Sequence, residues 1–199
     1  MCKSNDNILN PDRAGWVLAG GRSRRMGADK ALLADSDGRP LALQVAEKLA
    51  RVCGTVSLVG DPARYSHLGL PVVPDEFAET GPLAGIEAAL RTTSAPFNLI
   101  VACDMPALDC AIFQDLFGIG GDCALPQYAD GRVEPLCAVY HRSCAAAIRA
   151  AIESGVRKVT DALRFLEGQS LELRYVRVPG AAAFANLNTP EDLQRYRNG

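Results

Sequence analysis

The sequence predicts one α/β domain whose central sheet is mainly parallel. Short apolar runs rich in β-branched residues alternate with segments whose apolar residues recur at helical spacing, which is the pattern of strand–helix–strand units. The chain has 199 residues, 48% of them hydrophobic, which is enough for a single sizeable core. We therefore expect right-handed crossovers between neighbouring parallel strands.

In the first half of the chain, β-rich or apolar runs predict strands at residues 15–19, 55–59, 71–74 and 98–103. Helices are predicted at residues 40–53 and 82–91. In the first helix, apolar residues from Leu41 to Val52 recur at near-helical spacing, and Pro40 suits the first turn. The run 98–103 is apolar throughout and breaks at Asp104. A buried parallel strand ends in this way at a ligand-binding edge.

In the second half, strands are predicted at residues 123–127 and 133–140, around a turn at Asp130-Gly131, and at 171–178. Helices are predicted at residues 109–117, 142–153, 159–166 and 190–196. The helix at 142–153 is rich in alanine, and Thr189 is the expected N-cap of the last one.

Composition limits the classes of partner. The formal net charge is −2 and the pI is about 5.7, so no global positive field favours nucleic acid or an anionic membrane. The seven cysteines include no C-x-x-C pair, which indicates reduced thiols of a cytoplasmic protein and disfavours a structural zinc site. Residues 1–12 are polar and lack a secretory core. We expect a flexible leader there and the domain at residues 13–199.

Residues 18–30, LAGGRSRRMGADK, carry the strongest functional signal. Glycines after a strand let backbone N–H groups approach a ligand, and arginine and lysine side chains bind phosphate oxygens. The spacing differs from that of the P-loop and of the dinucleotide fingerprint. The segment predicts a polyphosphate-binding turn; the alternative is a cationic surface turn at a strand end.

Asp104 is the candidate metal ligand. It follows the apolar run in the segment ACDMP, and a carboxylate at the end of a buried strand can hold Mg²⁺ bridged to phosphate oxygens. The alternative is an N-cap for the helix after Pro106. The cationic loop in the same chain favours the metal role, because features of one site converge.

Four further positions admit both a functional and a structural interpretation. Gly81 and Gly85 flank a helix start in GPLAG, where Gly85 would let a flat base or a backbone pass closely; the alternative is a simple turn and helix N-terminus. Asp75 either accepts a hydrogen bond from a base or ribose or is a solvated acid. Arg157 either contacts a phosphate of a second substrate or is ordinary helix-end charge.

Asn186 and Asn188 lie in the segment NLNTPEDL. Alternate residues of an extended stretch point to the same side, and their amides can both donate and accept. A capped turn needs one asparagine, so two favour a binding site.

The segments LAGGRSRRMGADKALL, PDEFAETGPLAGIEAAL, ACDMP and NLNTPEDL have the order and spacing seen in the MobA-like molybdenum cofactor guanylyltransferases, which the chain resembles over residues 16–193. The resemblance implies a Rossmann-like nucleotidyltransferase fold of three layers. It also implies Mg²⁺-dependent transfer of GMP from GTP to the phosphate of molybdenum-bound molybdopterin, with release of pyrophosphate. Further partners would be molybdoenzymes or cofactor-insertion proteins.

The resemblance also implies roles for individual residues. The nucleotide would be held by Leu18, Ala19, Gly20 and Gly21. Arg25 and Lys30 would neutralise the triphosphate and act catalytically, and Asp104 would hold Mg²⁺ and contact the nucleotide. Asp75 would contact the nucleoside, and Gly81 and Gly85 would shape the base side. The acceptor would be contacted by Arg157, Asn186 and Asn188.

The chain departs from the family pattern in two places. Lys158 follows Arg157 where two arginines are common, and the chain has Val59-Gly60-Asp61 where an asparagine often follows the second strand. We assign no role to Glu134. Close cytidylyl relatives look more like LAAG at the first turn and lack GPLAG, so the resemblance favours guanine. The alternatives are cytidylyl transfer to the same cofactor, another small-molecule nucleotidyltransferase, or a non-catalytic nucleotide-binding partner, which should have lost Lys30 or Asp104.

Overall fold

The computed structural model describes residues 10–20, 29–77, 80–180, 184, 186–187 and 189–198. A 7-stranded sheet in the order β3-β2-β1-β4-β6-β5-β7 forms its centre. The strands are β1 Arg13–Leu18, β2 Thr55–Val59, β3 Val72–Val73, β4 Phe97–Ala102, β5 Cys123–Gln127, β6 Cys137–His141 and β7 Leu173–Arg177.

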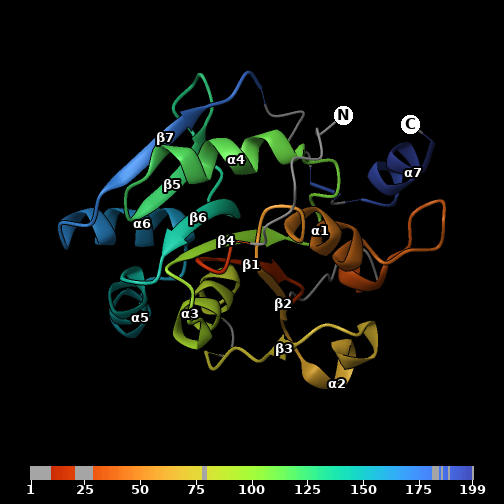
Figure 1. Cartoon of the computed structure of the whole chain (residues 1–199), viewed down its shortest axis with the longest axis horizontal. Coiled ribbons are helices and arrows are strands. Elements are labelled where there is room, and N and C mark those ends of the chain that lie inside the picture. The colour runs from red at the N-terminus through yellow and green to blue at the C-terminus, as the bar shows by residue number, and fades with distance from the viewer. Residues whose placement is uncertain are drawn as a thin grey trace.

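Helices cover both faces of this sheet (Figure 1). The helices are α1 Leu41–Leu49, α2 Pro62–Tyr65, α3 Pro82–Thr92, α4 Cys110–Ile119, α5 Cys144–Glu153, α6 Val159–Gly168 and α7 Pro190–Asn198. Two short 3-10 helices, η1 Lys30–Leu32 and η2 Ser66–Leu68, complete the described elements.

Two apolar clusters identify the layers. One cluster joins the buried residues of α1 and α4 to one face of the sheet, and the other joins those of α3, α5 and α6 to the opposite face. The largest side chains buried between the layers include Phe113 from α4 and Ile86 from α3. The predicted three-layer α/β fold with a mainly parallel sheet is therefore confirmed.

The sheet reverses its direction of growth at β1. Strand β1 pairs in parallel with β2 on one side and with β4 on the other, and the chain visits β2 and β3 before it returns to β4. Such a switch point opens a crevice at the carboxyl ends of the two central strands, where open α/β sheets bind ligands. Strand β6 is antiparallel to both of its neighbours. Its pairing with β5 agrees with the predicted turn at Asp130-Gly131, whereas its antiparallel pairing with β4 was not predicted.

Several elements differ from the sequence predictions, among them one strand and one short helix. The strand predicted at 133–140 begins only at Cys137, and Val133 forms an isolated bridge with Gln127. Pro135 has no N–H to donate to a ladder, which accounts for the interruption. Helix α2 was not predicted, since four residues are too few to show helical periodicity.

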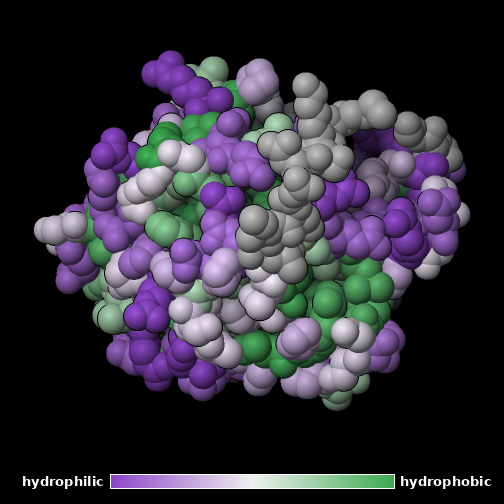
Figure 2. Space-filling view, in the orientation of Figure 1, coloured by the Kyte–Doolittle hydropathy of each residue, from purple (hydrophilic) through white to green (hydrophobic). Residues whose placement is uncertain are grey.

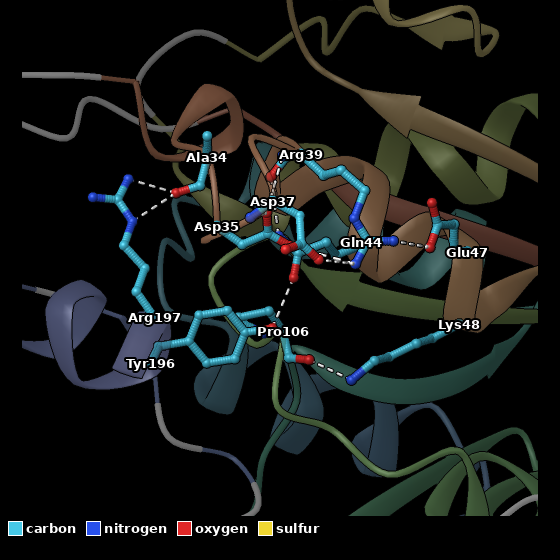
Figure 3. Close-up of polar contacts among 10 residues, drawn as sticks. All are labelled: Ala34, Asp35, Asp37, Arg39, Gln44, Glu47, Lys48, Pro106, Tyr196 and Arg197. Carbon is cyan, nitrogen blue, oxygen red and sulfur yellow. Dashed lines mark hydrogen bonds and ion pairs between the residues drawn. The ribbon is translucent and has the colours of Figure 1, made fainter. Parts of the chain in front are cut away.

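Helix α7 is hydrogen-bonded to α1 and to Ala34, which precedes α1. Tyr196 Oη donates to Gln44 Oε1 of α1 at 2.7 Å, and Arg197 Nε donates to the Ala34 carbonyl at 2.9 Å (Figure 3). Thr189 Oγ1 accepts from the Asp192 amide at 3.1 Å, so its predicted N-cap role is confirmed.

Hydrophilic residues are spread over the face shown in Figure 2, with apolar ones gathered toward its lower right. None of the helices in the described ranges is both long enough and apolar enough to cross a bilayer. The cysteines of the described residues are free and buried, as predicted for reduced core thiols; they are at positions 53, 103, 110, 123, 137 and 144. Cys2 lies outside the described residues.

Candidate active site

Four neighbouring strands end in a row at one edge of the sheet. The register pairs Leu18 of β1 with the last residue of β2 and with the last residue of β4, while β2 and β3 also end together. Gly20, Gly60, Asp75 and Asp104 follow these strands, each within two residues of a strand end. The sequence candidates Gly20, Asp75 and Asp104, which are far apart in the chain, therefore share one edge.

A cleft of about 730 Å³ opens on the β1–β3 side of this edge. Its volume is in the range of small-molecule sites. Its lining residues come from the strand ends, from α2 and from the start of α3: Gly20, Gly60, Asp61, Pro62, Arg64, Tyr65, Pro74, Asp75, Phe77 and Gly81. Three predicted nucleotide residues, Gly20, Asp75 and Gly81, thus face one cavity.

Gly85 lies inside α3 on the side that faces β1. A Cβ there would come 3.0 Å from Leu18 Cδ2. Helix α3 therefore packs closely on β1 at this point, and the role of Gly85 on the base side stays a prediction. Leu18 and Ala19 are buried, and the Leu18 carbonyl accepts from the Cys103 amide at 3.2 Å.

Lys30 and Asp104 meet on the β1–β4 side of Gly20. Lys30 Nζ donates to Asp104 Oδ2 at 3.0 Å, and both side chains are largely enclosed, at 16% and 18% exposure. Lys30 opens η1, while Asp104 follows β4, so the pair joins residues 74 positions apart. Helix α4 is capped by Asp109, which accepts from the Ala111 amide at 3.0 Å. The alternative N-cap role for Asp104 is therefore wrong.

The loop that carries Asp104 is held by Lys48 of α1. Lys48 Nζ donates to the Pro106 carbonyl (Figure 3) and to the Leu108 carbonyl at 2.8 Å. Burial lowers the pKa of this ammonium below its ordinary value. The two carbonyls bind the loop to α1 and stabilise the position of Asp104.

The asparagine segment also reaches Asp104. The Leu187 amide donates to the Asp104 carbonyl at 2.9 Å, and α7 anchors the other end of the segment on α1. Asn186 Oδ1 is buried and has no hydrogen-bond partner among the described residues. A buried polar atom without a partner is costly, so this oxygen is available to a bound ligand. Asn188 lies outside the described residues.

Glu134, to which no role is assigned from the sequence, precedes β6 and is hydrogen-bonded locally. Its Oε1 accepts from the Leu136 amide at 3.3 Å. Burial raises the pKa of its carboxyl above the usual range, and the charge of Asp104 adds to the increase.

Arg157 makes local contacts. Its Nη1 donates to the carbonyl groups of Ile152 and Val156 at 3.0 and 2.9 Å, so it closes the carboxyl end of α5. Its acceptor contact remains a prediction. The predicted site residues Gly21 and Arg25 lie outside the described residues, as do residues 1–9 of the predicted leader.

Comparison with known proteins gives consistent relatives. A sequence model of the "MobA-like NTP transferase domain" matches residues 15–169. A probable molybdenum cofactor guanylyltransferase of Pelotomaculum thermopropionicum is 37% identical over 92% of this chain and 91% of its own length. The molybdenum cofactor guanylyltransferase of Cereibacter sphaeroides is 39% identical over 91% of this chain and 93% of its own.

Solved structures resemble the fold. Molybdopterin-guanine dinucleotide biosynthesis protein A of Archaeoglobus fulgidus superposes with a TM-score of 0.74 at 28% identity, covering 93% of this chain and 97% of its own. A nucleotidyl transferase from Methanothermobacter superposes with a TM-score of 0.73 at 17% identity, covering 94% and 96%. At that lower identity the likeness concerns the fold alone.

Proposed function

This chain is a nucleotidyltransferase of the MobA-like NTP transferase family, and from that premise we propose that it transfers GMP from Mg²⁺-GTP to the phosphate of molybdenum-bound molybdopterin. Pyrophosphate is the leaving group. The observation that carries the proposal is the Lys30–Asp104 pair at the β1–β4 switch point, beside a cleft of nucleotide size. The names of the relatives support guanine and molybdopterin as the substrates.

The reaction requires positioning and charge neutralisation more than covalent chemistry. An oxygen of the acceptor phosphate attacks the α-phosphorus in line with the departing pyrophosphate, so no protein nucleophile is needed. Lys30 and Asp104 form an ion pair at 3.0 Å. Lys30 would neutralise the phosphates and the leaving group, and the Asp104 carboxylate would hold the cation.

The residues at this edge fit Mg²⁺. Among the described residues, no group of three or more His, Cys, Asp or Glu side chains could hold a metal ion by itself. Mg²⁺ is commonly held by one or two carboxylates together with substrate phosphates, and Asp104 supplies one such carboxylate. When bound, the ion would stabilise negative charge on the phosphates.

We assign the nucleoside to the cleft and the acceptor to the other side of Asp104. Asp75 and Gly81 line the cleft, where Asp75 would accept from the nucleoside. Asn186 reaches Asp104 through the backbone of Leu187, which supports an acceptor role for the segment. A cytoplasmic location is part of the proposal and is supported by the free buried cysteines.

The decisive experiment measures pyrophosphate release from each of the four NTPs, with and without molybdenum-loaded molybdopterin. We expect release from GTP only when the acceptor is present. Release from CTP in its place would support the cytidylyl alternative. Nucleotide binding without any release would support a non-catalytic partner.

Asn186→Asp should impair use of the acceptor while GTP binding is largely kept. The aspartate has nearly the same size but puts a negative charge where an acceptor phosphate would lie, and we expect a loss of about 1–3 kcal/mol in acceptor binding. Asn188→Asp should act in the same way. Titration with GTP and with the pterin substrate, alongside the melting temperature, separates the two ligands.

The matched control is Thr189→Ala, which removes the α7 cap at a cost of about 1 kcal/mol. It should lower the melting temperature and leave acceptor binding intact. If Asn186→Asp shows the same pattern, the asparagine is only a structural part of the turn.

A further inference from the structure

We propose that Tyr65 is a positioning residue for the transfer reaction. Its hydroxyl is hydrogen-bonded to Ala19 and to Asp29, the residues on either side of residues 20–28, and so positions Lys30 next to Asp104. The inference rests on the proposed function. It concerns Tyr65, to which neither the sequence motifs nor the comparisons give a role.

The geometry of one hydroxyl carries the proposal. Tyr65 ends α2 and is 2% exposed. Its Oη lies 2.8 Å from the carbonyl oxygen of Ala19 and 2.8 Å from Asp29 Oδ2. Ala19 is the last residue before the glycine-arginine segment and Asp29 is the first after it. One phenolic hydrogen is shared between these two acceptors, which brings both ends of the segment to the same atom.

Asp29 connects the Tyr65 hydroxyl to the turn that begins at Lys30. Its Oδ1 accepts from the Ala31 amide at 3.1 Å and caps η1, the turn that begins at Lys30. Its Oδ2 takes the Tyr65 hydroxyl, with Arg64 Nη1 at 3.4 Å. A carboxylate bonded on both oxygens has one orientation, so the direction in which Lys30 leaves the turn depends on Tyr65.

The tyrosine ring is itself held by a glycine. A Cβ at Gly60 would come 2.6 Å from Tyr65 Cε2, so the ring packs against the bare backbone after β2. Burial, and then the neighbouring Asp29, raise the pKa of the Tyr65 hydroxyl above its ordinary value. The group therefore remains a hydrogen-bond donor at neutral pH.

The test is a double-mutant cycle with Tyr65→Phe and Lys30→Ala, because coupled residues show non-additive effects. Tyr65→Phe keeps the buried ring and removes only the hydroxyl. We expect kcat for pyrophosphate release to fall about tenfold, with a smaller change in KM for GTP, because a misplaced catalytic group is costly. In the Lys30→Ala background the same change should alter kcat by less than about twofold.

Tyr140→Phe is the matched control. Tyr140 is also buried, at 1% exposure, and its hydroxyl donates to a carbonyl, that of Pro135, at 2.8 Å. It should lower the melting temperature by a similar amount while its effect on kcat stays small and adds to that of Lys30→Ala. A purely structural role for Tyr65 predicts the same additive pattern, and finding it would overturn the proposal.

Hydrogen exchange of the Ala31 amide separates this inference from the proposed function, because it needs no turnover. Tyr65→Phe should speed exchange of this amide relative to the core amides of β4, and Tyr140→Phe should not. If the wild-type chain released no pyrophosphate, the proposed function would fail. Faster exchange of the Ala31 amide in Tyr65→Phe would still support the link that Tyr65 makes between Ala19 and Asp29. Unchanged exchange and unchanged kcat in Tyr65→Phe would refute the inference.

Discussion

Asp104→Asn is expected to keep its fold and lose at least about a hundredfold in kcat, because a neutral amide cannot provide the charge that a carboxylate places beside a phosphate-bound cation. The amide has the size of the carboxylate and can still accept from Lys30. The melting temperature should therefore change little. The measurement is pyrophosphate release from GTP and acceptor under saturating Mg²⁺.

Asp109→Asn gives the matched comparison. It makes the same chemical change five positions away, at the N-cap of α4, where Asn caps as well as Asp. Turnover should remain normal in this variant. Near-normal kcat in Asp104→Asn as well would mean that the metal assignment is wrong.

Lys30→Ala is expected to lower kcat more than it raises the KM for GTP. Negative charge on the departing pyrophosphate grows toward the transition state, so a cation at this position stabilises the transition state more than the bound substrate. Removing Lys30 also takes a partner from the largely enclosed Asp104 carboxylate, at a cost of about 1–3 kcal/mol. Steady-state kinetics over a range of GTP concentrations gives both constants.

Lys30→Arg serves as the control that keeps the charge and changes its geometry. It should lie between wild type and Lys30→Ala, because the planar guanidinium is not equivalent to an ammonium. Arg25→Ala should resemble Lys30→Ala. An effect confined to KM in both alanine variants would mean uniform binding and would remove these residues from catalysis.

Local sequence patterns predicted the elements that depend on local composition. Strands 55–59 and 123–127 agree with the structure at both ends, and the apolar run before Asp104 is the buried strand β4. The N-cap at Thr189 was also correct. In each case the residues that determine the structure lie within a few positions of one another.

The candidate site was predictable in its chemistry and not in its contacts. Gly20, Asp75 and Gly81 were predicted from motifs, and the cleft brings them together. Gly85 instead packs against Leu18, because the helix geometry directs it to the sheet. Tyr65 was missed because its helix is too short to be recognised and its partners are distant in sequence.

The sequence by itself determined the alternation of strands and helices, the residue types of the phosphate loop and the family resemblance, because periodicity and motifs are properties of neighbouring residues. Only the tertiary structure decided the strand order, the antiparallel pairing of β6 with β4 and the meeting of Lys30 with Asp104. These depend on pairings between segments far apart in the chain, 74 residues for that ion pair, and the packing of whole layers selects such pairings, not any local pattern.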